Sequence, residues 1–239
     1  MKPTWSRSRG GLTLIEILIV ITIMSVLLAL AVPALLASQL ASNERAILAT
    51  IKTVAVANYD FRGNDRDGNG ISDFWTGDVS GLFSMTSAAI PGFNDSVIKL
   101  IELPVALADS APLAAGQAGG ELQGISAFGA ISNKSGFWIA VLDTDAQTGE
   151  DYQTSTGGTP LMGDVHHNGK FGIIAYPDAY GASGKVAVIL NEQGVVYRRH
   201  IQSSIKPAGG LTPPGPLTNA SYKDWPSDQN IKSYWSKTD

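Results

Sequence analysis

A run of short acidic side chains interrupted by glycine begins at residue 65 of the 239-residue chain. It reads Asp65-Arg66-Asp67-Gly68-Asn69-Gly70-Ile71-Ser72-Asp73 and matches the first nine positions of an EF-hand-type loop. Calcium takes about six to eight oxygen ligands, and alternating short acidic side chains on a tight loop can converge to supply them. The pattern therefore predicts a Ca²⁺ site, with ligands from Asp65, Asp67, Asn69, Asp73 and the carbonyl oxygen of Ile71.

Two features separate this segment from a complete EF-hand. Thr76 stands at the twelfth position, where the loop normally carries a bidentate glutamate, so Asp78 or water would have to complete the ligand shell. Neither flank has the pattern of an EF-hand helix pair. The alternative is a hydrated turn in which the Asp and Asn side chains bond to their own backbone, and the sequence leaves both interpretations open.

Two weaker metal candidates lie further along the chain. Residues 142–151 (LDTDAQTGED) alternate aspartates in a similar way but lack a glycine at the turn position. Asp164, His166 and His167 could bind a transition metal, because histidine is the commonest ligand for one. Adjacent histidines usually point in opposite directions on a strand or lie in a polar turn, however, and no third strong ligand is evident from the sequence.

The sequence gives little support for catalysis. An exported hydrolase needs a Ser-His-Asp set, a pair of carboxylates in a cleft or an H-E-x-x-H motif, and no persuasive set is present. The third of the three histidines, His200, lies beside Arg198 and Arg199 in a predicted strand, where a surface position is expected. We therefore predict no catalytic residues and no enzymatic activity.

Composition narrows the function classes further. There is no cysteine, which excludes disulfides, thiolate metal sites and a cysteine nucleophile. The net charge is −4, and three of the 17 basic residues (Lys2, Arg7 and Arg9) precede a long apolar run. The rest of the chain thus carries 14 basic against 21 acidic residues. This acidic body argues against nucleic acid as a partner, since nucleic-acid binding needs clustered positive charge.

The apolar run is long enough to span a membrane. Residues 17–36 carry no charge, and about 20 helical residues cross the ~30 Å hydrocarbon core of a bilayer. The preceding basic residues favour a cytoplasmic N-terminus. A secretory signal peptide is the competing interpretation, but its apolar region is normally about 7–15 residues long, and here Pro33 lies inside the run.

Glu16 is the discriminating residue, because an acidic side chain at the centre of a membrane helix costs about 2.5–3.5 kcal/mol. It stands in Gly11-Leu12-Thr13-Leu14-Ile15-Glu16, after a short basic leader that ends in two glycines. The segment resembles the class III signal of type IV pilins and type II secretion pseudopilins. The resemblance implies that a prepilin peptidase cuts after Gly11 and methylates the amine of Leu12, although Leu12 departs from the usual Phe or Met. It also implies that Pro33 kinks the apolar helix.

Glu16 has a physical role in this interpretation. Cleavage leaves the free amine of Leu12 about one helical turn before the glutamate. The glutamate of one subunit can then neutralise the amine of its neighbour inside the membrane. Because an unpaired buried charge is costly, that pairing can select the subunit register. The alternative is a glutamate that only reaches back to the cytoplasmic interface.

The leading hypothesis is therefore a structural subunit that assembles into a type IV pilus or a type II secretion pseudopilus, as a homo- or hetero-polymer with other pilins or pseudopilins. The resemblance implies a prepilin peptidase and an inner-membrane assembly platform as further partners. The alternative is a non-polymerising, membrane-anchored module that binds calcium or another ligand outside the cytoplasm. The expected location is the bacterial inner membrane, in a single pass with the N-terminus cytoplasmic and the head periplasmic or extracellular, and then the assembled fibre.

The elements that position these residues can be outlined. Beyond Pro33, apolar residues recur at helical spacing, so the helix is expected to leave the membrane, lay one face on a head and end before Gly63. Helices are also expected at residues 97–107 and over 80–89. Short β-branched and aromatic runs predict strands at residues 137–142, 171–176, 185–190 and 195–201, the last two joined by a hairpin at 191–194.

Together these features predict an α+β, pilin-like fold, in which a long N-terminal α-helix, half transmembrane and half amphipathic, packs on an antiparallel β-sheet head. Residues 171–201 also resemble the end of an uncharacterised secreted bacterial domain family, which supports this fold and implies an extracytoplasmic location. Trp225 and Trp235 either dock the C-terminal tail on the head or stay exposed. The expected segments are a cytoplasmic leader (1–11), a transmembrane helix (12–36), an amphipathic helix (37–61), a globular head (62–206) and an extended Pro/Gly-rich tail (207–239).

Overall fold

The protein is described by a computed structural model at residues 11–68, 70–86, 97–115, 122–153, 165–201 and 223–238. The chain divides into two units, Met1–Gln39 and Leu40–Asp239, each of which is described by itself. The first helix, α1 (Leu14–Gly63), contributes residues to both. The long N-terminal helix and the antiparallel sheet are both present, so the predicted α+β fold is confirmed.

In the first unit, every residue from 11 to 39 is solvent-exposed, although most are apolar. Leu27 and Leu36 expose 61% and 55% of their surface. The helix continues through Pro33, whose ring has no N–H to donate to the preceding turn. Among the described residues, α1 is the one helix long and apolar enough to cross a membrane. An apolar surface of this length is stable in lipid or against other apolar helices, and not in water.

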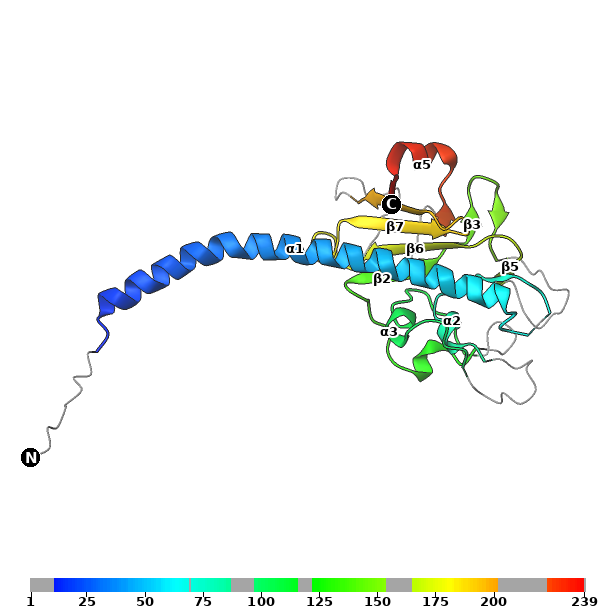
Figure 1. Cartoon of the computed structure of the whole chain (residues 1–239), viewed down its shortest axis with the longest axis horizontal. Helices are drawn as coiled ribbons and strands as arrows, with labels where there is room; N and C mark the ends of the chain where they lie inside the picture. Colours follow the sequence, from blue (N-terminus) through cyan, green and yellow to red (C-terminus); the bar gives the residue numbers. More distant parts are fainter. Residues whose placement is uncertain are drawn as a thin grey trace, which may run out of the picture. The chain divides into compact units, whose positions relative to one another are not determined.

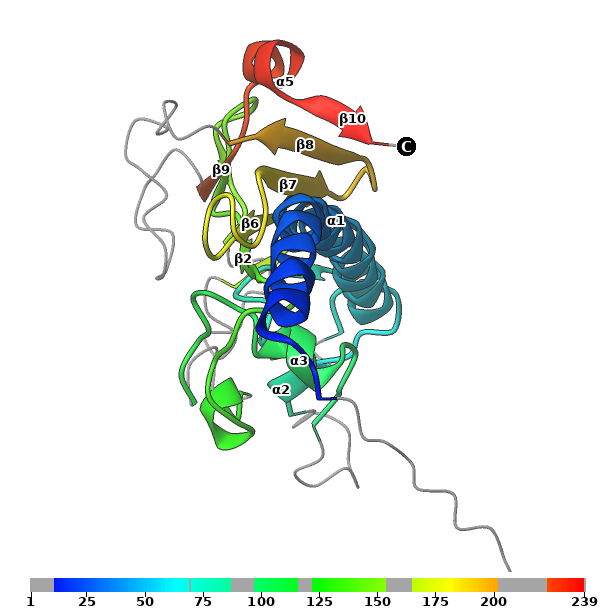
Figure 2. The ribbon, with the colours of Figure 1, turned by 90° about the vertical axis from the view of Figure 1, so that its left-hand side faces the viewer.

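The second unit is built around a five-stranded sheet with the order β10-β8-β7-β6-β2, which runs from top to bottom in Figure 2. All its pairings are antiparallel. Four of these strands confirm the predicted ones, and Gly194, at φ 72°, lies in the predicted turn between β7 and β8. Their bounds are β2 (Phe137–Val141), β6 (Gly172–Pro177), β7 (Val186–Asn191) and β8 (Val196–His200).

Both faces of this sheet are covered, which explains why β6 and β7 are buried at every position. One face belongs to the same hydrophobic cluster as Ile47, Ile51 and Val54 in the second half of α1, which crosses the sheet in Figure 1. The other face clusters with Trp225 and Tyr152. A strand with one wet face alternates apolar and polar residues, whereas a strand covered on both faces reads as a continuous apolar run.

The C-terminal segment completes the sheet instead of forming a free tail. Strand β10 pairs with β8 at the edge of the sheet, and Trp225 is 3% exposed. Of the two alternatives predicted for Trp225, docking on the head is therefore the one observed, and residues 223–238 are not a free extended tail. Residues 207–222 lie outside the described part of the chain. The segment contains β9 (Asp224–Trp225), α5 (Asp228–Tyr234) and β10 (Ser236–Thr238).

The two shorter helices predicted at residues 80–89 and 97–107 are mostly wrong. Among the described residues of these two ranges, only α2 (Gly81–Ser84) and α3 (Leu103–Ala106) form. Lys99 has a φ of 52°, which an α-helix does not allow, and the N–H groups on either side of it bond to the segment after α2 and to α2 itself. Residues 87–96 lie outside the described chain.

Three short elements complete the head. A 3₁₀ turn, η2, spans Ile125–Ala127. Strand β3 (Thr144–Asp145) pairs antiparallel with β4 (Glu150–Asp151) and parallel with β9. This small sheet ties the loop after β2 to the C-terminal segment.

A two-stranded sheet forms at the end of α1. Strand β1 (Phe74–Trp75) pairs with β5 (His166–His167), so that Trp75 lies opposite His166. Asn58 of α1, 2% exposed, holds β1 in place. Its Nδ2 donates to the carbonyl oxygen of Trp75 at 2.8 Å, and its Oδ1 accepts the N–H of Trp75 at 3.0 Å. The helix therefore fixes β1, and β1 in turn fixes β5.

Asn58→Ala is expected to lower the free energy of unfolding of the head by about 2 kcal/mol or more, because two buried backbone groups of Trp75 lose their partner. Thr53→Ala is the control, since it changes an exposed residue of the same helix and should cost less than about 0.5 kcal/mol. Urea denaturation followed by tryptophan fluorescence measures both. Equal losses in the two variants would contradict the role given to Asn58.

Two buried aspartates hold the segment that follows β1. Oδ2 of Asp109 accepts the N–H groups of Val79 and Ser80 at 2.7 and 2.8 Å. Asp78 accepts the N–H groups of Gly81 and Leu113, both at 2.8 Å. Both aspartates are 1% exposed. Their carboxylates satisfy backbone donors at the start of α2 and in the loop after α3, which is a structural role.

The backbone around Asp109 also lies along the outer edge of β2. Ile139 donates its N–H to the carbonyl oxygen of Ala108 at 2.8 Å and accepts the N–H of Ser110 at 2.9 Å. This is a parallel bridge centred on Asp109 and Ile139. The β2 edge is therefore paired at this point.

Burial, together with the charge of Asp78, raises the pKa of Asp109 to about 8. An unfolded aspartate has a pKa of about 3.9, so between about pH 4 and pH 8 the folded protein holds a proton that the unfolded chain has lost. The stability that this group contributes is therefore complete below about pH 4 and is lost as the pH rises through about 8.

We expect the free energy of unfolding to fall between about pH 5 and pH 9, and the fall to become shallower in Asp109→Asn. Asp151→Asn, at an exposed position in β4, is the control and should leave the slope unchanged. Urea denaturation at a series of pH values measures the slope. The same slope in Asp109→Asn and in the wild-type protein would show that Asp109 does not hold this proton.

Candidate functional site

The predicted cleavage point lies just before α1. Leu12 is 76% exposed, and residues 11–13 are not helical. The bond between Gly11 and Leu12 is therefore in exposed, non-helical backbone, which is the kind of segment that a peptidase can bind. Cleavage and methylation at this bond stay predictions.

Glu16 caps the helix of its own chain. Its Oε2 accepts the backbone N–H and the hydroxyl of Thr13, both at 2.8 Å, and Thr13 Oγ1 accepts the N–H of Glu16 at 3.2 Å. This reciprocal arrangement is a capping box, and it places the carboxylate at the positive end of the helix dipole. Thr13 is a residue that the sequence interpretation missed, although the T-x-x-E spacing is the signature of such a cap. Glu16 thus has polar partners within its own chain, without a neighbouring subunit.

Pro33 lies within α1. Its predicted role in assembly stays a prediction, as does that of Glu16.

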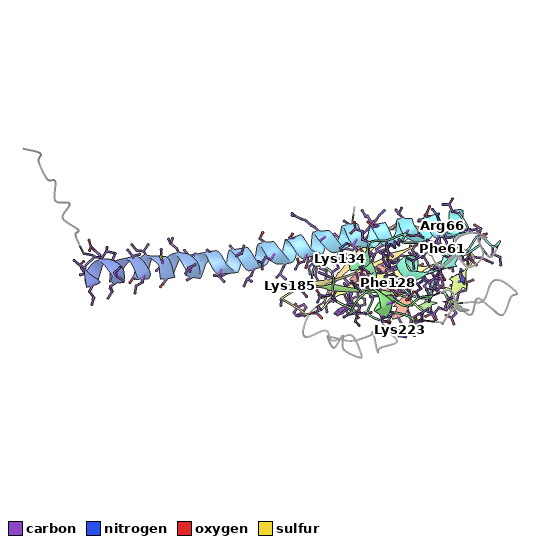
Figure 3. All side chains as sticks on the ribbon, turned by 90° about the horizontal axis from the view of Figure 1, so that it is seen from below. Phe61, Arg66, Phe128, Lys134, Lys185 and Lys223 are labelled. Carbon is purple, nitrogen blue, oxygen red and sulfur yellow. The ribbon has the colours of Figure 1, made fainter. Side chains whose placement is uncertain are left out.

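The acidic loop follows α1 directly, and the Arg66 label in Figure 3 marks its beginning. Asp67 is fully buried and Asp73 is 1% exposed. Arg66 turns away from them and pairs with Asp60 of α1 at 2.7 Å. The loop therefore directs two acidic side chains inward and sends its basic one back to the helix.

The remaining predicted ligands of the loop have different surroundings. Asp65, at φ 46°, accepts the N–H of Gly70 on Oδ2 at 3.0 Å, a bond within the loop. Gly70, at φ 79°, supplies the left-handed backbone expected at the turn. Ile71 is half-buried, and Asn69 lies outside the described residues. Of the five predicted ligands, the structure brings Asp67 and Asp73 together.

Two further details bear on the predicted calcium shell. The oxygens of Asp78 already accept hydrogen bonds from Ser80, Gly81 and Leu113, which disfavours the suggestion that Asp78 completes the shell. Strand β1 follows the loop where a second EF-hand helix would stand. On its C-terminal side the loop is therefore followed by a strand and not by an EF-hand helix, as the sequence predicts. Calcium binding itself stays a prediction.

His166, on strand β5, lies close to the two buried aspartates. Its Nδ1 lies 3.3 Å from Asp73 Oδ1, and its Nε2 lies 3.8 Å from Asp67 Oδ2. One ligand atom from each of the three residues lies within 4.8 Å of the others. In Figure 1, β5 lies beside the end of α1, which explains how a residue so distant in sequence reaches the loop.

The two adjacent histidines have opposite environments, as the sequence predicts for a strand. His166 is 2% exposed, whereas His167 is half-buried and its Nδ1 accepts the N–H groups of Gly169 and Lys170 at 3.0 and 2.8 Å. The predicted grouping with Asp164 lies partly outside the described residues. No local pattern indicates that His166 meets the acidic loop, because that contact depends on the pairing of β1 with β5.

The weaker aspartate cluster after β2 is engaged by lysines. Asp145 lies 3.1 Å from Lys170, and Asp143 lies 2.8 Å from Lys223. Lys170 also pairs with Glu150. Because these carboxylates already have cationic partners, they are a poor metal site.

Comparison with protein-family models gives two matches. Residues 6–32 match the prokaryotic N-terminal methylation motif. Residues 142–209 match a family of proteins of unknown function, DUF2950, in agreement with the resemblance seen for residues 171–201. Comparison with curated proteins and with solved structures gives no match.

The first match covers the end of the leader, Glu16 and most of the apolar run, and the second runs from the end of β2 beyond β8. The motif and the single apolar helix fit a membrane-anchored, single-pass protein. The motif also points to a structural subunit rather than an enzyme. The chain thus carries a prepilin signal of the type IV pilin and pseudopilin type, followed by a head that matches in part a family of unknown function.

Proposed function

We propose that the chain is a structural subunit that prepilin peptidase processes after Gly11 and that assembles through α1 into a type IV pilus or a type II secretion pseudopilus. The observation that carries this proposal is the N-terminal methylation motif on an exposed apolar helix with one acidic residue at its start. An ordinary membrane anchor has no use for Glu16, which costs free energy in lipid.

Processing changes what surrounds Glu16. Hydrolysis of the bond between Gly11 and Leu12 creates a positively charged amine next to Thr13, the residue that Glu16 caps. In the proposed polymer, the amine of one subunit pairs with Glu16 of its neighbour, so that neither charge stays alone in an apolar surrounding. The capping box holds the carboxylate at the helix start, where a neighbouring amine can reach it.

The remaining partners follow from the same signal. The apolar half of α1 is proposed to cross the inner membrane with the leader in the cytoplasm and to meet the assembly platform there. The head would lie outside the cytoplasm.

Calcium binding is a separate expectation, because calcium is the ion that the oxygen ligands of the acidic loop alone would favour.

Mass spectrometry of the membrane-extracted protein tests the processing step. The mature chain is expected to begin at Leu12 with one methyl group on its amine. Gly11→Ala should block cleavage and leave the precursor intact, whereas Gly10→Ala is the matched control. A mature N-terminus near residue 32 or 39 would instead identify an ordinary signal peptide.

Glu16→Ala and Glu16→Gln separate the two roles of Glu16. Glutamine can still cap Thr13 but carries no charge, whereas alanine removes both functions. If charge pairing drives assembly, both variants should be cleaved normally and yield at least about tenfold fewer sheared fibres or less secreted substrate. The readout is the amount of polymer per processed subunit.

Other outcomes would change the proposal. Normal assembly of Glu16→Gln alone would mean that capping, and not charge pairing, is what assembly needs. Normal assembly of both variants, or no fibre from the wild-type protein, would favour the alternative of an anchored module that does not polymerise.

A further inference from the structure

His166 is a buried imidazole that makes no hydrogen bond within the described part of the chain. It is 2% exposed, and neither ring nitrogen has a hydrogen-bond partner among the described residues. The ring stacks on Phe61, with centroids 6.0 Å apart, and meets the ring of Trp75 edge-on at 5.3 Å. These aromatic contacts fix the plane of the imidazole, so its nitrogens are directed and not free to turn toward water.

Both nitrogens face carboxylates. The distances are 3.3 Å from Nδ1 to Asp73 and 3.8 Å from Nε2 to Asp67, and each aspartate is at most 1% exposed. A metal ion bound at about 2.0–2.2 Å needs ligand atoms within roughly 4 Å of one another. Since the three candidate atoms already lie within 4.8 Å of one another, a small inward shift of the side chains would suffice.

The charges also suit a divalent cation. Two carboxylates buried this close together repel each other, and burial removes the water that would screen them. A divalent ion compensates both charges at once and takes the imidazole as a neutral third ligand. The surrounding Phe61 and Trp75 rings exclude solvent from one side.

The imidazole decides which class of ion fits. Calcium prefers a shell of oxygen atoms, whereas imidazole nitrogen suits zinc and other transition metals. We propose that Asp67, Asp73 and His166 form a binding site for a divalent transition-metal ion, for which Zn²⁺ is the probe. The ion would link the loop at the end of α1 to β5. This inference does not depend on the proposed role in assembly.

Metal retention by the full-length protein in detergent tests the proposal. The protein is stripped with a chelator, incubated with Zn²⁺, Ca²⁺ or both, dialysed, and analysed for metal by mass spectrometry. The wild-type chain should retain about one Zn²⁺ in the presence of excess Ca²⁺. His166→Gln should weaken Zn²⁺ binding at least about tenfold. His167→Gln is the matched control, a neighbouring histidine that should keep the site.

X-ray absorption at the zinc edge tests the same site without any variant, in case His166→Gln does not fold. The spectrum of the wild-type protein should show one imidazole and otherwise oxygen ligands. A shell of oxygen alone would overturn the proposal. So would a failure to retain Zn²⁺, or an unchanged Zn²⁺ affinity in His166→Gln. Retention of Ca²⁺ against Zn²⁺ would return the loop to the calcium site predicted from its sequence.

Discussion

The packing of the second half of α1 against the five-stranded sheet is the interaction on which the head depends. Ile47, Ile51 and Val54 recur every three or four residues and bury one stripe of the helix in the main core. Because β6 and β7 are buried on both faces, the sheet needs a cover on each side. The helix supplies one cover and the segment around Trp225 supplies the other. In the last turn of the helix, which ends at Gly63, Phe61 packs against Trp75 and His166, so the helix also positions the acidic loop.

Much of this fold could be predicted from local sequence signals. The runs that form β2, β6, β7 and β8 are β-branched and aromatic, and they are short enough to be strands instead of helices. The segment before them misleads because its apolar residues have helical spacing, whereas the left-handed backbone of Lys99 and the pairing with α2 prevent a helix. The C-terminal segment misleads because its prolines and glycines indicate an extended tail, whereas Trp225 packs against residues that are distant in the sequence.

The candidate sites also differ in whether a local sequence signal indicates them. The prepilin signal around Glu16 could be predicted because it lies within a few residues, and the cap by Thr13 was equally local. His166 could not be predicted as a partner of the acidic loop, since no sequence pattern near His166 indicates a contact with residues 65–73. The family of unknown function matches the part of the chain that contains His166 but not Asp67 or Asp73. The metal cluster therefore combines one residue from inside that match with two from outside it.

The covered edges of the main sheet have a consequence for how subunits can join. On one side, β2 is bridged by the backbone around Asp109, and on the other, β8 is covered by the three-residue strand β10. Proteins that polymerise by strand exchange need a long, unpaired edge to accept a foreign strand. In the described part of the head, the main sheet offers only the outer side of β10, which is too short for that purpose. Growth by β-augmentation is thereby disfavoured, so in the proposed polymer one copy would join the next through contacts between side-chain surfaces.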